Sequence, residues 1–304
     1  MQDVIVIGGG TAGLTAAIYL QRSALQCVVL EGDNFGGRIF PTLAIDNYPG
    51  LPGISGYDYS EKLREQAKDL GADLQSKTAI ALMRDGNLWK VTTRDGELVA
   101  NAIVYAAGEK QRLLGIPGES ELLGKGVATC AACDGAFFRK KDVVIVGGGD
   151  KALDDALTLS RICTSVHLIH RRDEFRAAGS TVAKVQAADN ITLHLNSVLK
   201  RINGTNRVEG ATIGSVDGST QTELEVSGVF IAVGSDPLTE LCAKYVELDE
   251  QGYILAGEDC RTNEPGLFVA GDVRRKPLRQ LVTAAADGAV AGQAAAQYII
   301  HNKQ

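Results

Sequence analysis

The stretch VIVIGGGTAG at residues 4–13 decides the fold class of this chain of 304 residues. Its β-branched beginning is typical of a buried parallel strand, and Leu14–Leu20 beyond it has the composition of a helix. Between them, Gly8 permits a tight turn, Gly10 lets the backbone approach a pyrophosphate, and Gly13 lets the helix pack close to the strand. The stretch therefore predicts a Rossmann-like strand–turn–helix unit that binds a dinucleotide.

The next predicted strand, Cys27–Leu30, ends at Glu31, 23 residues after Gly8. A carboxylate at this place accepts hydrogen bonds from a ribose diol, while the N–H groups that begin the preceding helix bind the phosphates. The first unit thus favours an adenine dinucleotide with a free ribose, such as FAD or NAD.

The same pattern recurs in VVIVGGGDKA at residues 143–152, followed by a predicted strand at Val166–Ile169. Gly147, Gly149 and Ala152 take the places of the three glycines of the first copy. Glycine-rich turns are common and can be purely structural. Here both copies have the strand, the helix and the second strand that dinucleotide binding requires.

The two copies differ after their second strands, where the second copy has His170, Arg171 and Arg172, with Arg176 four residues on. A carboxylate at this position would repel a 2′-phosphate, whereas a cationic cluster binds it through charge-assisted hydrogen bonds. A solvated surface pair is the structural alternative for the arginines, but their position after the strand favours NADPH binding.

Cys130 and Cys133 form a CxxC pair just before the second copy. A structural zinc site needs four ligands, and the chain offers no second CxxC and no suitable pair among its four histidines. A closely spaced dithiol instead indicates a redox centre, in which one cysteine attacks and the other resolves.

Asp134 follows the second cysteine and can exchange a proton with a thiolate if its surroundings raise its pKa. The alternative is a purely structural Asx turn before Gly135. Together the three features predict an electron path from NADPH through a flavin to a disulfide, with the cofactors supplying the hydride and electron chemistry.

Composition excludes several other classes. A chain with 45% hydrophobic and 22% charged residues is long enough for about two domains and is not disordered. The net charge of −6 favours neither a nucleic-acid nor a membrane-surface partner. No apolar run reaches the length of a membrane span and no basic leader is present, so we expect a cytoplasmic protein. The four scattered cysteines are expected to be buried small hydrophobes.

The chain resembles the low-molecular-weight thioredoxin reductases over nearly its whole length. The segments that carry the resemblance are GGGTAG at 8–13, GGRIF at 36–40, DNYPG at 46–50, CAACDG at 130–135, GGGDKA at 147–152, HRRDEFR at 170–176 and AGDVRRKPLRQ at 270–280. The resemblance implies an α/β architecture of two Rossmann-like domains: a discontinuous FAD domain of residues 1–112 and 246–304, and an NADPH domain of residues 113–245 inserted into it.

Family roles can be carried over where the motifs match. The resemblance assigns the ADP half of FAD to Gly8, Gly10, Gly13 and Glu31. It assigns the flavin half to Gly36, Gly37, Asn47, Gly271, Asp272, Arg279 and Gln280, and gives Gly108 as a further cofactor-binding residue. It assigns the NADPH pyrophosphate to Gly147, Gly149 and Ala152, and the 2′-phosphate to His170, Arg171, Arg172 and Arg176. It also implies that Cys133 faces the flavin, that Cys130 attacks the protein substrate, and that Asp134 is the acid/base.

The family precedent is a homodimer that reduces thioredoxin and rotates one domain against the other, with hinges expected near residues 112–118 and 236–246. Lys151 departs from the small residue usual after GGGD, so a donor other than NADPH (ferredoxin or a second flavin) is an alternative, as is another disulfide partner. A non-catalytic redox sensor is a further alternative, which the presence of both Cys130 and Cys133 disfavours.

Overall fold

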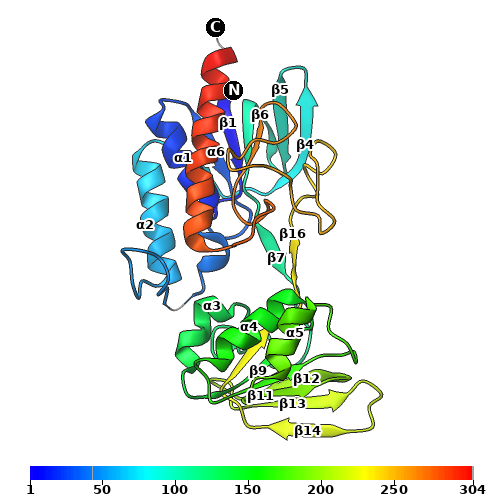
Figure 1. Cartoon of the computed structure of the whole chain (residues 1–304). Coiled ribbons are helices and arrows are strands. Elements are labelled where there is room, and N and C mark those ends of the chain that lie inside the picture. Colours follow the sequence, from blue (N-terminus) through cyan, green and yellow to red (C-terminus); the bar gives the residue numbers. More distant parts are fainter. Residues whose placement is uncertain (43, 303–304) are drawn as a thin grey trace. The chain divides into compact units, whose positions relative to one another are not determined.

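The computed structural model describes residues 1–42 and 44–302 and divides into two compact units. Unit 1 consists of Met1–Lys110 and Asp236–Gln304, and unit 2 consists of Gln111–Ser235. Each unit contains a parallel sheet with helices on one face (Figure 1). The expected class, two Rossmann-like α/β domains with the second inserted into the first, is confirmed.

The sheet of unit 1 has the strand order β3-β2-β1-β6-β5-β4, and β17 pairs with β6. Strands β3, β2, β1, β6 and β17 are parallel, whereas β4, β5 and β6 form an antiparallel extension. The strands are β1 (Gln2–Ile7), β2 (Cys27–Leu30), β3 (Asp73–Gln75), β4 (Ala79–Asp85), β5 (Leu88–Thr93), β6 (Gly96–Tyr105) and β17 (Leu267–Val269). The helices are α1 (Thr11–Arg22), the 3₁₀ turn η1 (Gly37–Ile39), α2 (Gly56–Asp69) and α6 (Leu281–Asn302).

Alternation along β1 explains why this sheet is covered on both faces. Val4 and Val6 face one core, which they share with residues of α1 and α6. These two helices lie on the same face of the sheet (Figure 1). Ile5 and Ile7 face the other, which they share with Trp89 of β5 and with the segment around residues 242–254. Parallel strands buried on both faces are continuously apolar, as this β-branched run is.

The parallel sheet of unit 2 has the order β11-β10-β9-β15-β8. Its strands are β8 (Val127–Ala128), β9 (Asp142–Val146), β10 (Ser165–Ile169), β11 (Ile191–His194) and β15 (Gly228–Ile231). A separate antiparallel sheet contains β12 (Ser197–Asn203), β13 (Gly210–Ser215) and β14 (Gln221–Leu224). The helices are α3 (Ala131–Asp134), the 3₁₀ turn η2 (Gly135–Phe138), α4 (Asp150–Ser160) and α5 (Gly179–Gln186).

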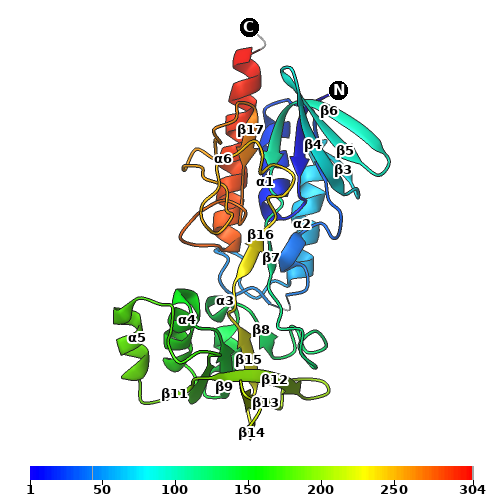
Figure 2. The ribbon, with the colours of Figure 1, turned by 90° about the vertical axis from the view of Figure 1, so that its right-hand side faces the viewer.

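Two layers cover the parallel sheet of unit 2. Val143 and Ile145 of β9 pack against α4 on one face. Val144 and Val146 pack against β12 and β13 on the other, so the antiparallel sheet occupies the side opposite the helices (Figure 2). Unit 2 thus repeats the strand–turn–helix start of unit 1 with a different second layer.

The chain crosses between the units along a two-stranded ribbon, β7 (Glu109–Gln111) paired with β16 (Ser235–Pro237). The second crossing differs from the expected boundary, because residues 236–245 belong to unit 1. Cys242 is fully buried in the core of unit 1, and the ring of Tyr245 packs edge-on against Trp89 at 5.0 Å between centroids. These apolar contacts hold the segment in unit 1 and shorten the inserted unit.

Within residues 1–42 and 44–302, none of the helices combines the length and the apolar character that crossing a membrane requires.

Candidate active site

Three glycines of the first dinucleotide motif have distinct environments between β1 and α1. Gly8 has φ +106°, and a Cβ there would overlap the carbonyl oxygen of Ala106. A Cβ on Gly13 would overlap the carbonyl oxygen of Gly8, whereas a Cβ on Gly10 would meet only the oxygen of Gly36, at 3.9 Å. The fold itself therefore requires glycine at positions 8 and 13, while the space beside Gly10 is open to a ligand.

Glu31 lies directly after β2 and its carboxylate is bound to the glycine-rich loop. Gly9 N–H donates to Glu31 Oε2 at 2.7 Å, and Asp33 N–H donates to Oε1 at 2.9 Å. The structure thus brings the predicted ribose-binding carboxylate next to the predicted phosphate-binding loop.

The segments around Gly36 and Asn47 come from two further loops of unit 1. Gly36 and Gly37 have φ of +105° and +63°, and Gly36 N–H donates to the carbonyl oxygen of Gly9 at 2.8 Å. Asn47 Nδ2 donates to Gln280 Oε1 at 2.9 Å. Gly36 and Gly37 therefore lie against the glycine-rich loop. The hydrogen bond between Asn47 and Gln280 joins residues that are 233 positions apart in the sequence.

Gly271 and Asp272 follow the end of β17. Gly271 has φ +81° and its N–H donates to Asp287 Oδ2 at 3.0 Å. Burial raises the pKa of Asp272, and the Glu109 carboxylate adds to the rise. In the described part of the chain, Asp272 Oδ1 is one of four buried side-chain polar atoms without a hydrogen-bond partner. A buried acceptor of this kind is costly unless a ligand donates to it.

Arg279 lies against the same segment. Its Nε donates to the carbonyl oxygen of Asp272 at 3.2 Å, and its guanidinium carbon is 3.8 Å from the ring centroid of Tyr253. Its Nε is also 3.7 Å from Glu109 Oε2. The predicted residues Asp272 and Arg279 are thus in direct contact.

Sequence reasoning missed three charged or polar neighbours of this region: Arg38, Glu109 and Tyr253. Arg38 Nη1 is 2.6 Å from Glu109 Oε1, and the Tyr253 hydroxyl donates to Oε2 at 2.9 Å. The available sequence signal was only that Glu109 directly follows Gly108, a residue already assigned to cofactor binding. In the structure Gly108 has φ +72° just after β6, with open space where its Cβ would lie.

The second dinucleotide motif repeats the first in its geometry. A Cβ on Gly147 would overlap the carbonyl oxygen of Ala232 and would be 2.6 Å from the Cβ of Ala152. A Cβ on Gly149 would meet no atom within 4 Å. The middle glycine is again the one that the fold does not itself require, which is the arrangement expected of a phosphate-binding turn.

Lys151, which departs from the family pattern, is held along α4. Its Nζ is 2.8 Å from Asp155 Oδ2, one helical turn away. The ammonium group therefore has a carboxylate partner within its own helix.

His170 was predicted to belong to the cationic cluster around the 2′-phosphate, but in the structure its side chain is buried. Its Nε2 lies 3.0 Å from the carbonyl oxygen of Glu174, and its ring stacks on Phe175 at 5.3 Å between centroids. Burial, and next the neighbouring arginines, lower the pKa of His170. The ring fills the space where a Cβ of Gly148 would be, so His170 packs against the loop and supports it.

The three arginines of this cluster are exposed beside the second glycine-rich loop. Arg171 and Arg172 follow β10, and Arg176 N–H donates to the carbonyl oxygen of Gly148 at 2.7 Å. An isolated bridge pairs Arg176 with Gly149. The structure thus brings positive charge next to the loop where the second nucleotide is predicted.

Cys130 and Cys133 form a disulfide at the start of α3, with 5.3 Å between their Cα atoms. Cys130 is the N-cap residue, and its Sγ accepts a hydrogen bond from Cys133 N–H at 3.2 Å. Both residues are half-buried, whereas Cys27, Cys163, Cys242 and Cys260 are buried free thiols, as expected. A thiolate at a helix N-terminus is stabilised by the backbone N–H groups that point toward it.

Asp134 is the residue after Cys133 and the last residue of α3. Burial raises its pKa from the usual value to about 6. It also precedes η2, but its side chain makes no capping hydrogen bond there, so the Asx-turn interpretation is wrong. A carboxyl group with this pKa can donate and accept a proton near neutral pH.

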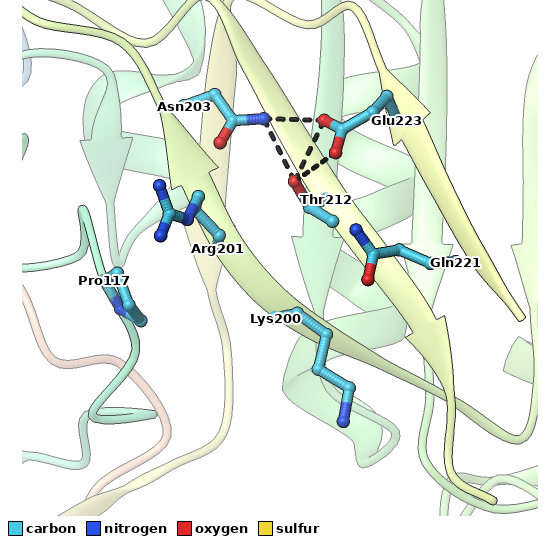
Figure 3. Close-up of a pocket in the computed structure, with 7 residues that line it drawn as sticks. All are labelled: Pro117, Lys200, Arg201, Asn203, Thr212, Gln221 and Glu223. Carbon is cyan, nitrogen blue, oxygen red and sulfur yellow. Dashed lines mark hydrogen bonds between the residues drawn. The ribbon is translucent and has the colours of Figure 1, made fainter. Parts of the chain in front are cut away.

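A separate cavity of about 520 Å³ lies against the antiparallel sheet of unit 2 (Figure 3). Asn203, Thr212 and Glu223 line it and bond to one another, with Glu223 Oε2 2.7 Å from Asn203 Nδ2 and Oε1 2.8 Å from Thr212 Oγ1. Because these polar groups already have partners, the cavity gives no indication of a ligand.

A family model described as pyridine nucleotide-disulphide oxidoreductase matches residues 2–289. The chain belongs to this family. It is 43% identical to a thioredoxin reductase of Mycolicibacterium smegmatis over 96% of this chain and 94% of that protein. It is also 41% identical to the bifunctional thioredoxin reductase/thioredoxin of Mycobacterium leprae (strain TN), over 96% of this chain and 64% of that protein.

Among solved structures, the thioredoxin reductase from Streptococcus pyogenes MGAS5005 matches with a TM-score of 0.94 and 37% identity, covering 99% of both chains. The resemblance of the sequence to the thioredoxin reductases of this family is thereby confirmed.

Proposed function

We propose that the protein is a thioredoxin-disulfide reductase that takes electrons from NADPH through FAD. The observation that carries the proposal is the Cys130–Cys133 disulfide at the start of α3, next to a carboxyl group whose pKa is raised to about 6. The thioredoxin reductases to which the chain is similar over nearly its full length support the same function.

The residues of unit 1 fit FAD. The open space beside Gly10 accommodates a pyrophosphate at the start of α1, and Glu31 lies within reach of the same loop. The unpartnered Asp272 Oδ1 is an acceptor suited to a hydroxyl group of the cofactor. Gly36, Gly37, Asn47, Gly108, Gly271, Arg279 and Gln280 would complete the site.

The residues of unit 2 fit NADPH. Gly147, Gly149 and Ala152 form the turn before α4, and Gly149 leaves room for phosphates. Arg171, Arg172 and Arg176 would bind the 2′-phosphate, while the buried His170 holds the loop. When bound, the two cofactors supply the hydride and electron transfer that reduce the disulfide.

The cysteines then pass the two electrons on by thiol–disulfide exchange. The Cys130 thiolate attacks one sulfur of the substrate disulfide, forming a mixed disulfide and releasing the other substrate sulfur as a thiolate. Cys133 attacks Cys130 Sγ, which re-forms the Cys130–Cys133 disulfide and releases the second substrate sulfur. The substrate is reduced to a dithiol, and Asp134 donates a proton to a departing thiolate.

Thioredoxin is the proposed protein substrate. A relative that carries thioredoxin in the same polypeptide as a reductase supports this assignment. The homodimer and the cytoplasmic location stay predictions.

The test is an anaerobic spectral titration of the FAD-loaded protein with NADPH and, in parallel, with NADH. We expect NADPH to bleach the flavin band and NADH to do so weakly, and added thioredoxin to be reduced. Cys133→Ser should retain bleaching and lose turnover with thioredoxin. A flavin that dithionite reduces but NADPH does not would contradict the proposed donor, and full turnover by the variant would contradict the disulfide mechanism.

A further inference from the structure

The Glu109 cluster, formed by Arg38, Glu109, Tyr253 and Arg279, is a group of charged and polar side chains in unit 1, of which the sequence motifs predict only Arg279. The Glu109 side chain is only 8% exposed. Its Oε1 is 2.6 Å from Arg38 Nη1, and its Oε2 accepts the Tyr253 hydroxyl at 2.9 Å and lies 3.7 Å from Arg279 Nε. A buried carboxylate of this kind is stable only while its partners stay in place.

On one side, the cluster is attached to the segments that we assign to the flavin. Arg38 follows Gly37 directly, and Arg279 precedes Gln280. Arg279 also donates to the carbonyl oxygen of Asp272 at 3.2 Å, and its guanidinium group stacks on Tyr253. Glu109 thus holds two arginines that come from separate loops of the proposed FAD site.

On the other side, the cluster is attached to the ribbon that joins the units, because Glu109 is the first residue of β7. Just before it, the carbonyl oxygen of Gly108 accepts the N–H of Leu238, the residue that follows β16. The Glu109 side chain therefore bonds to loops of the proposed FAD site, while its backbone forms the start of the ribbon that joins the two units.

We propose that Glu109 is a positioning residue that couples FAD binding to the order of the β7–β16 ribbon. Its carboxylate fixes Arg38 and Arg279 for the cofactor, and these same contacts fix the start of β7. Because coupling between two equilibria is reciprocal, FAD stabilises the ribbon and an ordered ribbon increases FAD affinity. The proposal rests on the FAD site of the proposed function.

The first experiment measures the dissociation constant of FAD, by quenching of its fluorescence, for the full-length apoprotein and four variants. Glu109→Ala and Arg38→Ala should each raise the constant by about tenfold, within the range usual for coupled sites. Glu109→Gln should fall between Glu109→Ala and wild type, because the amide can still bond to Tyr253 but carries no charge for the arginines. Lys110→Ala is the matched control, since Lys110 is exposed and should leave the constant unchanged.

The second experiment measures hydrogen exchange at the Leu238 amide with and without FAD. Binding should slow this exchange in the wild type and in Lys110→Ala, and should leave it nearly unchanged in Glu109→Ala. If that variant does not fold, Glu109→Gln should show a smaller slowing than the wild type. FAD affinity and exchange that match the wild type in these variants would overturn the coupling alone. A wild-type protein that binds no FAD would overturn the proposed function, and the coupling with it.

Discussion

The carboxyl group of Asp134 titrates in the range in which the proposed reaction needs a proton donor. Its pKa of about 6 results from burial beside the redox disulfide, with no capping hydrogen bond to the backbone of η2. The protonated form is present below this pKa and is lost as the pH rises through it. An acid role for Asp134 therefore predicts a contribution to catalysis that weakens above pH 6.

Asp134→Asn tests this role. We expect the variant to lose about 10² to 10⁴ in the single-turnover rate of thioredoxin reduction at pH 6, the usual contribution of general acid catalysis. The ratio of wild-type to variant rate should fall as the pH rises from 6 to 8, because the wild type loses its proton donor. Asp154→Asn, a change at an exposed position of α4, is the control and should leave this ratio at one. A ratio that does not vary with pH would contradict the acid role.

Arg171 and Arg172 determine the choice between the two nicotinamide nucleotides, if the 2′-phosphate binds where we propose. A hydrogen bond to a charged group contributes about 1.5–3 kcal/mol, so replacing either arginine alone by alanine should raise KM for NADPH by about 10- to 150-fold. KM for NADH should stay the same, because NADH lacks the phosphate. The matched control is Arg161→Ala, also an exposed arginine of unit 2. Equal losses with both nucleotides would place the 2′-phosphate elsewhere.

At the scale of elements, each strand–turn–helix unit contains two kinds of glycine. At some positions a Cβ would overlap the protein itself, and at others it would occupy only the space proposed for a ligand. We expect Gly13→Ala to lower the free energy of unfolding by about 1–3 kcal/mol, because its Cβ would overlap the carbonyl oxygen of Gly8. Gly10→Ala should change it by less than about 0.5 kcal/mol and yet weaken FAD binding, since only the ligand would occupy that space. Denaturant unfolding and FAD titration of both variants measure the difference. Unaltered FAD affinity in Gly10→Ala would remove this loop from the site.

The repeated units could be predicted from the sequence because their requirements are local. A β-branched run, glycines at fixed spacing and a helix each follow from neighbouring residues, and the structure has β1, β2, β9 and β10 where they were expected. Of the Glu109 cluster only Arg279 could be predicted, because its contacts with residues 38, 109 and 253 arise through the tertiary fold. The role of His170 could not be predicted either, since only the fold shows that its ring is buried against the loop.

At the scale of the whole molecule, each unit has its own apolar cores, so each should unfold as a cooperative unit. We expect calorimetry of the apoprotein to resolve two transitions. NADP⁺ at a hundred times its Kd should stabilise only the transition of unit 2, by about 2.7 kcal/mol, and FAD should stabilise that of unit 1. Truncation to residues 111–235 identifies the transition of unit 2. A single transition that both ligands shift equally would mean that the units do not unfold independently.

The insertion of unit 2 into unit 1 also determines the order in which the protein can fold during synthesis. Residues 111–235 leave the ribosome as one continuous segment, so unit 2 can complete its sheets while the chain is still growing. The sheet of unit 1 begins with residue 2, but it lacks β17 and the covering helix α6 until residues 267–302 have emerged. Strand β1 therefore waits for α6 while more than 250 residues are added, and its apolar face needs protection by chaperones or by transient contacts until α6 has been synthesised.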